Sequence, residues 1–153
     1  MFSNGDKAIE WLRANHGDSV VSVGEYRGQH WAQIKLSDIQ SVCAELKSNP
    51  ETSYDFLVDV TAVHWPGQAE PIEIVYHLYS YATGDRLRLK TRAAEGAPIP
   101  TVATIWRSAD WNERETYDMF GIEFEGHPDL RRILMPDDYT DYPLRKEFPL
   151  YRG

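Results

Sequence analysis

Residues 113–134 contain the side chains of this sequence that are most capable of chemistry. The stretch reads ERETYDMFGIEFEGHPDLRRIL and combines acids, arginines and one histidine. Glu115 and His127 could act as a general acid–base pair if the fold brought them within hydrogen-bond distance. Alternatively, Glu113, Glu115 and His127 could supply the carboxylate and imidazole ligands of a metal ion.

Both kinds of site normally require additional residues that this sequence does not place nearby. The HExxH spacing, which puts two metal ligands on one helical face, does not occur. No serine or cysteine is placed to complete a nucleophilic triad, and no glycine pattern after a strand resembles a phosphate loop. The remaining histidines are scattered singly, and we expect them to be structural or exposed: His16, His30, His64 and His77. We therefore expect no catalytic residue, no metal site and no cofactor on this chain.

The tail of the chain, residues 122–153, mixes cations with acids, which favours a surface that binds another protein. Its cations include Arg131, Arg132, Arg145 and Lys146. A guanidinium group forms two parallel hydrogen bonds with a carboxylate, so these side chains could lock the segment onto an acidic neighbour. The alternative is a set of surface ion pairs of little energetic value. Nearby aromatic residues such as Trp111 and Tyr117 favour the interface, because aromatics and arginine are enriched at contact hot spots.

Length, composition and charge limit the classes of function. A chain of 153 residues with 42% hydrophobic and 26% charged residues is typical of one soluble domain with its own core. Its one cysteine, Cys43, cannot supply the four thiolates that an iron–sulfur cluster usually needs, and we expect it in the core. A net charge of -8 argues against nucleic-acid binding. No apolar run approaches the roughly 20 residues that span a bilayer, and we expect no export signal.

Periodicity and turn signals predict the elements that must position these residues. A helix over 6–16 should precede an antiparallel hairpin of strands 19–26 and 30–36. Ser37 and Gln40 match a capping box that would start a second helix, which runs to about residue 49. Further strands are predicted over 54–64, 71–81 and 86–92, with a short strand or extended segment over 101–106. The first of these three is apolar enough for a central strand.

A third helix is predicted over 109–120, capped by Ser108 and ended by a left-handed Gly121. If it is an ordinary solvated helix, Arg114 and Asp118 form an ion pair on it while Trp111, Tyr117 and Phe120 face the core; the alternative is that its aromatic residues belong to an interface.

Four prolines after Gly121 rule out a long helix, so residues 122–153 are expected to form an extended tail that does not bury itself. Pro128 holds His127 extended, and the His127 ring could bind Glu115 or Asp118 and so connect tail to helix.

These elements predict an α+β, two-layer domain. Helix, hairpin, helix and three strands would form a mixed sheet with helices on one face, followed by the third helix. We place the domain at 1–121 and treat 122–153 as an extended docking tail of the same domain.

Four segments resemble the family of the C subunit of NADH:quinone oxidoreductase, which includes the mitochondrial iron–sulfur protein 3 subunit and the chloroplast and cyanobacterial J subunit. The segments are ERE at 113–115, DMFG at 118–121, HPDLRRIL at 127–134 and PLRK at 143–146. The resemblance implies interface or folding roles for Glu113, Arg114, Glu115, Asp118, Gly121, His127, Pro128, Arg131, Arg132, Pro143, Arg145 and Lys146.

The same resemblance implies a non-catalytic assembly subunit in the quinone module of a proton-translocating complex I. It would dock onto the D subunit near the quinone site, with the B and I subunits nearby, at the cytoplasmic side of the cell inner membrane. NADH, FMN, iron–sulfur clusters and quinone would belong to other parts of that complex. The alternatives are an equivalent subunit of a membrane-bound hydrogenase or a ferredoxin- or F420-fed complex, and a free-standing acid–base enzyme using Glu115 and His127.

Overall fold

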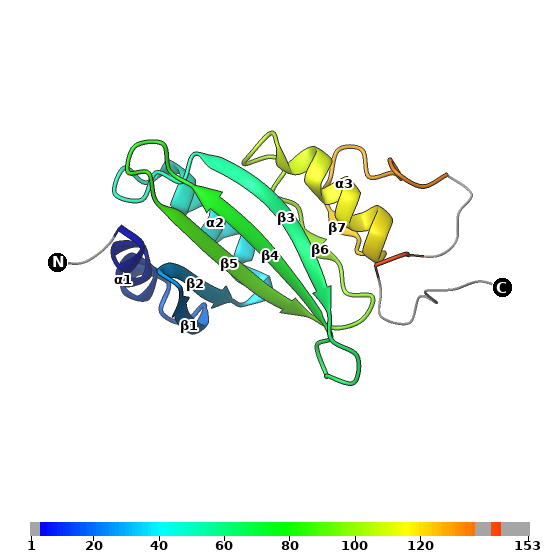
Figure 1. Cartoon of the computed structure of the whole chain (residues 1–153), viewed down its shortest axis with the longest axis horizontal. Helices are drawn as coiled ribbons and strands as arrows, with labels where there is room; N and C mark the ends of the chain where they lie inside the picture. Colours follow the sequence, from blue (N-terminus) through cyan, green and yellow to red (C-terminus); the bar gives the residue numbers. More distant parts are fainter. Residues whose placement is uncertain (1–3, 137–141, 145–153) are drawn as a thin grey trace.

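A computed structural model describes residues 4–136 and 142–144 of the chain, as a five-stranded mixed sheet with three α-helices and a second, two-stranded sheet (Figure 1). The elements in chain order are α1 (Asn4–His16), β1 (Val20–Tyr26), β2 (Gln29–Ile34), the 3-10 turn η1 (Leu36–Asp38), α2 (Ile39–Ser48), β3 (Phe56–His64), β4 (Ile72–Tyr79), β5 (Arg86–Ala93), β6 (Ile99–Pro100), α3 (Ala109–Phe120) and β7 (Phe124–Glu125). This arrangement confirms the predicted α+β class.

The strand order of the main sheet is β1-β2-β5-β4-β3, with β2 and β5 parallel and the other neighbours antiparallel. The predicted hairpin is confirmed, and Arg27 and Gly28 form its turn with positive φ angles of 53° and 79°. The prediction that the apolar strand β3 is central is wrong, because β3 lies at the edge and β5 at the centre.

An edge strand as apolar as β3 is tolerated because α3 runs along its outer side (Figure 1). Two hydroxyl groups on and before that helix donate to β3 carbonyls that have no neighbouring strand. Ser108 Oγ lies 2.8 Å from the Leu57 oxygen, and Thr116 Oγ1 lies 3.1 Å from the Val60 oxygen. Ser108 therefore occupies the predicted helix start, but its side chain binds the sheet instead of capping α3.

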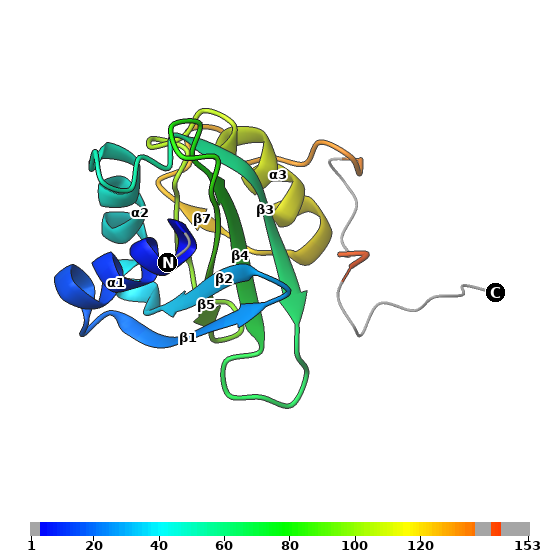
Figure 2. The same ribbon diagram turned by 60° about the vertical axis from the view of Figure 1, so that its left-hand side comes forward.

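Helices α1 and α2 lie on one side of the sheet, as Figure 2 shows, and the hydrophobic core fills the space between them. Cys43 on α2 is fully buried there, as predicted, and burial raises the pKa of its thiol. The opposite face of the sheet carries no described helix, so the strands alternate between buried and more exposed side chains.

Two local predictions are wrong. The Ser37–Gln40 capping box does not form, since α2 begins at Ile39 after η1, and Gln40 Nε2 instead donates to the Thr101 oxygen at 2.8 Å. The short strand is not at 101–106 but at β6, where it pairs in parallel with β7, an element that the sequence patterns did not predict.

The expectation that residues after Gly121 do not bury themselves is wrong for the first of them. Ile122 and Phe124 belong to the hydrophobic core, and Phe124 lies in β7, which pairs with β6.

Candidate functional site

The third helix has the predicted bounds, and its C-terminal end shapes the site. Gly121 takes a left-handed conformation with φ 75°, and its N–H donates to the Tyr117 oxygen at 2.8 Å. A Cβ atom at Gly121 would lie 2.7 Å from the Tyr142 ring. Leu144 N–H donates to the Met119 oxygen at 3.0 Å. Glycine therefore both ends α3 and lets residues 142–144, with Pro143, lie against the helix end.

Asp118 is the anchor of the segment that follows β7. Its side chain has no exposed area, and its carboxylate accepts hydrogen bonds from four groups. Arg132 Nη1 lies 2.7 Å from Oδ1, while Oδ2 accepts from the backbone N–H groups of Ile133, Leu134 and Met135 at 3.2, 2.6 and 2.8 Å. We call this arrangement the Asp118 cradle. It fixes the backbone of residues 132–135 on the last turns of α3.

The surroundings of Asp118 favour the ionised form of its carboxyl group. Burial by itself would raise the pKa of Asp118, but the hydrogen bonds from Met135, Arg132, Leu134 and Ile133 together lower it below its ordinary value. Arg132 also donates to the Asp118 backbone oxygen at 3.0 Å, and its guanidinium lies 4.8 Å from the centre of the Tyr142 ring. The predicted Arg114–Asp118 ion pair is therefore wrong, since Arg132 occupies Asp118.

His127 makes a second attachment, at the first turns of α3. Its Nδ1 accepts a hydrogen bond from the Asp129 backbone N–H at 3.0 Å. Nε2 therefore carries the proton and donates to the backbone oxygen of Asp110 at 3.1 Å. Arg114 lies between the same two acids, 3.0 Å from Asp110 Oδ1 and 3.2 Å from Asp129 Oδ2. The prediction that His127 joins tail to helix is confirmed. Its expected partners, Glu115 and Asp118, are wrong, because the chain returns to the start of α3 before it runs toward the helix end.

Glu113 points in the opposite direction, into the domain. The residue is fully buried, and its carboxylate accepts from the Thr101 hydroxyl and from the Val102 N–H at 3.1 Å. No basic side chain pairs with it among the described residues. Burial raises the pKa of Glu113 to about 7, against the lowering effect of these two hydrogen bonds. Glu113 holds the segment between β6 and α3 on the helix.

The other side of α3 and its attached segment faces solvent. Trp111 is 55% exposed, so the alternative in which it faces the core is wrong for this residue, while Phe120 is buried. Exposed side chains of this junction include Trp111, Glu115, Arg131, Leu134 and Leu144. We call them the outer surface of the junction. It combines an aromatic ring, two leucines and charges of both signs, the composition that protein interfaces favour.

The structure does not assemble the two chemical sites considered from the sequence. Glu115 is exposed, the His127 ring faces Asp110, and Glu113 is turned toward Thr101. Pro128 lies in the bend between His127 and Asp129. Arg145 and Lys146 lie outside the described residues.

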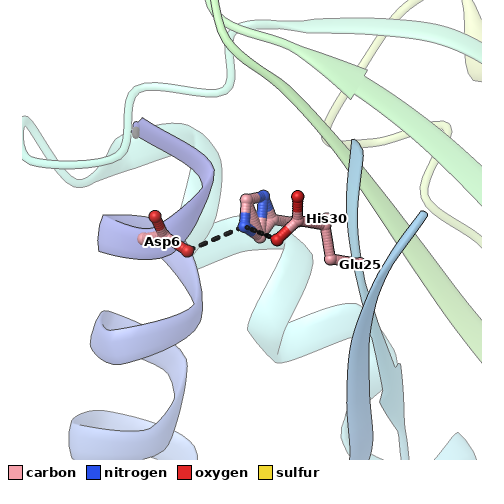
Figure 3. A group of neighbouring side chains, drawn as sticks. All are labelled: Asp6, Glu25 and His30. Carbon is pink, nitrogen blue, oxygen red and sulfur yellow. Dashed lines mark hydrogen bonds and ion pairs between the residues drawn. The ribbon is translucent and has the colours of Figure 1, made fainter. Parts of the chain in front are cut away.

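Among the described residues, metal-ligand side chains gather only at Asp6, Glu25 and His30 (Figure 3). His30 Nε2 lies 2.7 Å from Asp6 Oδ1 and 3.5 Å from Glu25 Oε2. The group joins α1 to the hairpin, and the expectation of a structural His30 agrees with it. Sequence spacing could not reveal the group, because Asp6 lies 24 residues from His30.

None of the described helices has the length and hydrophobicity that a bilayer-spanning segment requires. Fold and site together define a class: a small α+β domain whose charged motif fastens its own C-terminal segment and leaves a mixed outer surface exposed. The family model for the 30 kDa subunit of respiratory-chain NADH dehydrogenase matches residues 32–152. The chain belongs to this family, which confirms the resemblance that the four sequence segments indicated.

Curated relatives and solved structures agree with that assignment. The C subunit of NADH-quinone oxidoreductase from Geobacter metallireducens is 46% identical over 95% of this chain and 90% of its own length, and that from Geotalea uraniireducens is 42% identical over 97% and 90%. A trypsin-resistant fragment of Nqo5 superposes with a TM-score of 0.73 at 28% identity, covering 83% of this chain and 99% of that chain. A chain of an archaeal membrane-bound sulfane sulfur reductase superposes with a TM-score of 0.80 at 27% identity, covering 97% and 87%.

Proposed function

We propose that this chain is a structural and assembly subunit in the quinone module of a proton-translocating NADH:quinone oxidoreductase, and that it docks onto the D subunit near the quinone site. The observation that carries the proposal is the Asp118 cradle. It holds residues 132–135 on α3 and leaves Trp111, Arg131 and Leu134 exposed along the junction.

Preorganisation is the physical reason that such a junction suits docking. Binding requires side chains and loops to lose conformational freedom, which costs roughly 0.5–1.5 kcal/mol per immobilised flexible side chain. Because the cradle has already ordered the backbone, a partner would meet an assembled surface. Tryptophan and arginine, both present on this surface, are typical of interface hot spots.

The wider assignment follows from the same proposal. The B and I subunits would be the further neighbours, and the complex would hold the chain at the cytoplasmic side of the inner membrane. The electron carriers NADH, FMN, iron–sulfur clusters and quinone would be bound by other subunits. The buried thiol of Cys43 supports this division, since a single protonated cysteine in the core is a poor ligand for a cluster.

A second candidate is the equivalent subunit of a related membrane complex with another electron donor or acceptor. The similarity to the archaeal sulfane sulfur reductase chain favours it, because that match covers nearly the whole of this chain. Both candidates use the same outer surface. They differ in the subunits that would accompany the chain.

The test is to purify a tagged full-length chain from detergent-solubilised membranes and identify the subunits that accompany it. Trp111→Ala should lower recovery of the complex by about 30-fold or more, as expected for a hot spot worth about 2 kcal/mol. Trp65→Ala is the matched control, because Trp65 is also exposed but lies in the turn after β3. Equal recovery of the two variants, or recovery of the chain alone, would contradict the proposal.

The similar Nqo5 fragment is trypsin-resistant, which supports a second readout. Trypsin should cut the isolated chain within its C-terminal tail and leave the domain intact. In the purified complex, the same sites should be protected. Unchanged cleavage in the complex would argue against docking through the tail.

A further inference from the structure

The sheet face opposite α1 and α2 carries a row of cations on its central strand. The residues of β5 alternate between buried side chains and cations, and the cations are Arg86, Arg88, Lys90 and Arg92. Side chains on one face of a strand repeat every two residues, so neighbouring cations stand roughly 7 Å apart. We call these four residues the cation row. No described helix covers this face, which looks toward the viewer in Figure 1.

Most of the cation row has no carboxylate partner. Arg92 pairs with Glu73 at 3.2 Å, but Arg86, Arg88 and Lys90 form no ion pair with any described residue. Arg88 Nη2 reaches only the Gln29 amide oxygen, and its Nε is buried without a hydrogen-bond partner. The whole chain carries a net charge of -8, so three neighbouring cations without an ion-pair partner stand out against the overall excess of acids. Neighbouring like charges cost free energy that an anion would relieve.

Aromatic rings lie beside the row and support it. Lys90 Nζ lies 4.6 Å from the centre of the Trp31 ring, and Arg86 lies 5.7 Å from the centre of the Tyr79 ring. Trp31 packs against Gly24 on β1, where a Cβ atom would come within 2.5 Å of the indole. The absence of a side chain at Gly24 therefore makes room for the ring that supports Lys90.

The row ends at an exposed aromatic group and a depression. Tyr81 stands edge-on to Tyr79, with ring centres 5.1 Å apart, and its ring centre lies 5.8 Å from that of Phe56. Next to Arg86, a depression of about 330 Å³ is lined in part by Gln29, Asp59, His77, Arg86 and Arg88. Tyrosine, tryptophan and arginine together are the residues enriched at protein–protein hot spots.

We propose that this helix-free sheet face is a second docking surface, which receives an acidic segment of another polypeptide whose carboxylates pair with Arg86, Arg88 and Lys90. Charge complementarity identifies the partner, since carboxylates match guanidinium groups in geometry and sign. Nucleic acid fits less well, because the chain is strongly acidic and Asp59 and Glu73 lie on the same face. The proposal does not depend on which complex contains the chain.

Site-specific photo-cross-linking tests the proposal. A benzoylphenylalanine replacing Tyr81 preserves every cation and lies at the end of the row, whereas the same residue replacing Lys7 lies on α1. Full-length chain should be irradiated in solubilised membranes and the linked peptides sequenced. The expected result is a link from position 81 to a peptide in which Asp and Glu outnumber Lys and Arg. Links to lipid, to a second copy of this chain or to a basic peptide, or no link at all, would overturn the proposal.

Charge-reversal variants test quantitatively whether the cross-link depends on the cation row. Arg86→Glu with Lys90→Glu should reduce the yield of that link about tenfold or more, while the control Lys7→Glu with Arg13→Glu leaves it unchanged. Thermal unfolding of each isolated variant checks that the fold is intact. Equal link yields in the two double variants would overturn the proposal, as would row-dependent binding of the chain to phosphatidylglycerol vesicles. Failure of the chain to accompany oxidoreductase subunits would count against the proposed function alone, because an acidic partner can be linked in either case.

Discussion

Two carboxylates of α3, Glu113 and Asp118, are both fully buried, yet their surroundings shift their pKa values in opposite directions. Glu113 has two neutral donors and no cation, so burial dominates and the pKa rises to about 7. Asp118 has Arg132 and three backbone N–H groups, and these outweigh burial. Burial alone therefore does not decide whether an acid in this motif is charged. The number and charge of its donors do.

The difference also separates two tasks within one short motif. The Asp118 cradle uses a carboxylate that is charged at neutral pH to hold residues 132–135, which lie next to the outer surface of the junction. Glu113 holds the segment before α3 and can lose its charge near neutral pH. Asp118 orders the segment beside the outer surface, and Glu113 fixes the helix to its domain.

Breaking the cradle should produce the largest effect. Asp118→Asn removes the charge facing Arg132, whose side chain is 6% exposed, and breaking a buried ion pair in this way costs roughly 3–5 kcal/mol. Urea unfolding measures the loss in stability, and faster tryptic cleavage after Arg132 detects local release of the segment. Arg131→Gln is the control, because Arg131 is 66% exposed and its pair with Asp129 should contribute little. Similar losses of stability in both variants would show that the Asp118 cradle contributes no more than a surface ion pair.

Replacing Glu113 should have the opposite effect to replacing Asp118, because it should raise the stability of the chain at neutral and alkaline pH. A carboxyl whose folded-state pKa is raised contributes stability below its unfolded value near 4.5, and that contribution is lost as pH rises to about 7. Glu113→Gln should therefore stabilise the chain at pH 8, by on the order of 3 kcal/mol at most, and flatten the decline between pH 5 and 7. Denaturant unfolding at several pH values measures this. A variant less stable than the parent at pH 8 would contradict the assignment.

Asp118 predicts the complementary behaviour in acid. Its folded-state pKa is lowered, so its contribution is present above the unfolded value and is lost as pH falls through the folded value. The parent should lose stability below about pH 4, where an unfolded aspartate begins to bind protons. Asp118→Asn should show a shallower acid transition in the same unfolding series, and an unchanged slope would argue against a charged cradle.

The close approach behind the cradle can be tested with matched glycines. Gly121→Ala should cost about 1–2 kcal/mol for its left-handed backbone and more for displacing Tyr142. Gly67→Ala has a similar positive φ of 86° but meets no atom within 4 Å, so it should show only the backbone cost. The difference in unfolding free energy between the two variants measures the packing of residues 142–144. Equal costs would mean that Tyr142 moves freely.

The smallest expected effect comes from removing a hydrogen-bond donor of Glu113. Thr101→Val removes one of its two donors, which should raise the pKa of Glu113 above 7 and cost about 1 kcal/mol at pH 8. Thr91→Val is the control, because the buried Thr91 hydroxyl has no hydrogen-bond partner. An NMR titration of the Glu113 carboxyl and unfolding measurements would check both. A lower pKa in Thr101→Val would contradict the role of the hydroxyl.

Several elements were predictable because their signals are local. The bounds of α3, the left-handed Gly121, the turn at Arg27 and Gly28, and the buried stripe of α2 all follow from residues close in sequence. The charged motif could also be located, and its similarity to a known family could be seen.

What each motif residue contacts was not predictable in the same way. Periodicity paired Arg114 with Asp118 and turned Trp111 inward, but periodicity describes an isolated helix and not the segment that returns to it. Ser37 and Gln40 matched a local cap, and the structure uses Gln40 for a contact 61 residues away.

By itself, the sequence determined the class of fold, the extent of most helices and strands, and the family, because these depend on short-range patterns and on residue identity. Only the tertiary structure decided which carboxylate is charged, which arginine is paired and which sheet face is open. Each of those properties depends on donors, cations and covering elements that come from distant parts of the chain, and the packed fold alone brings them together.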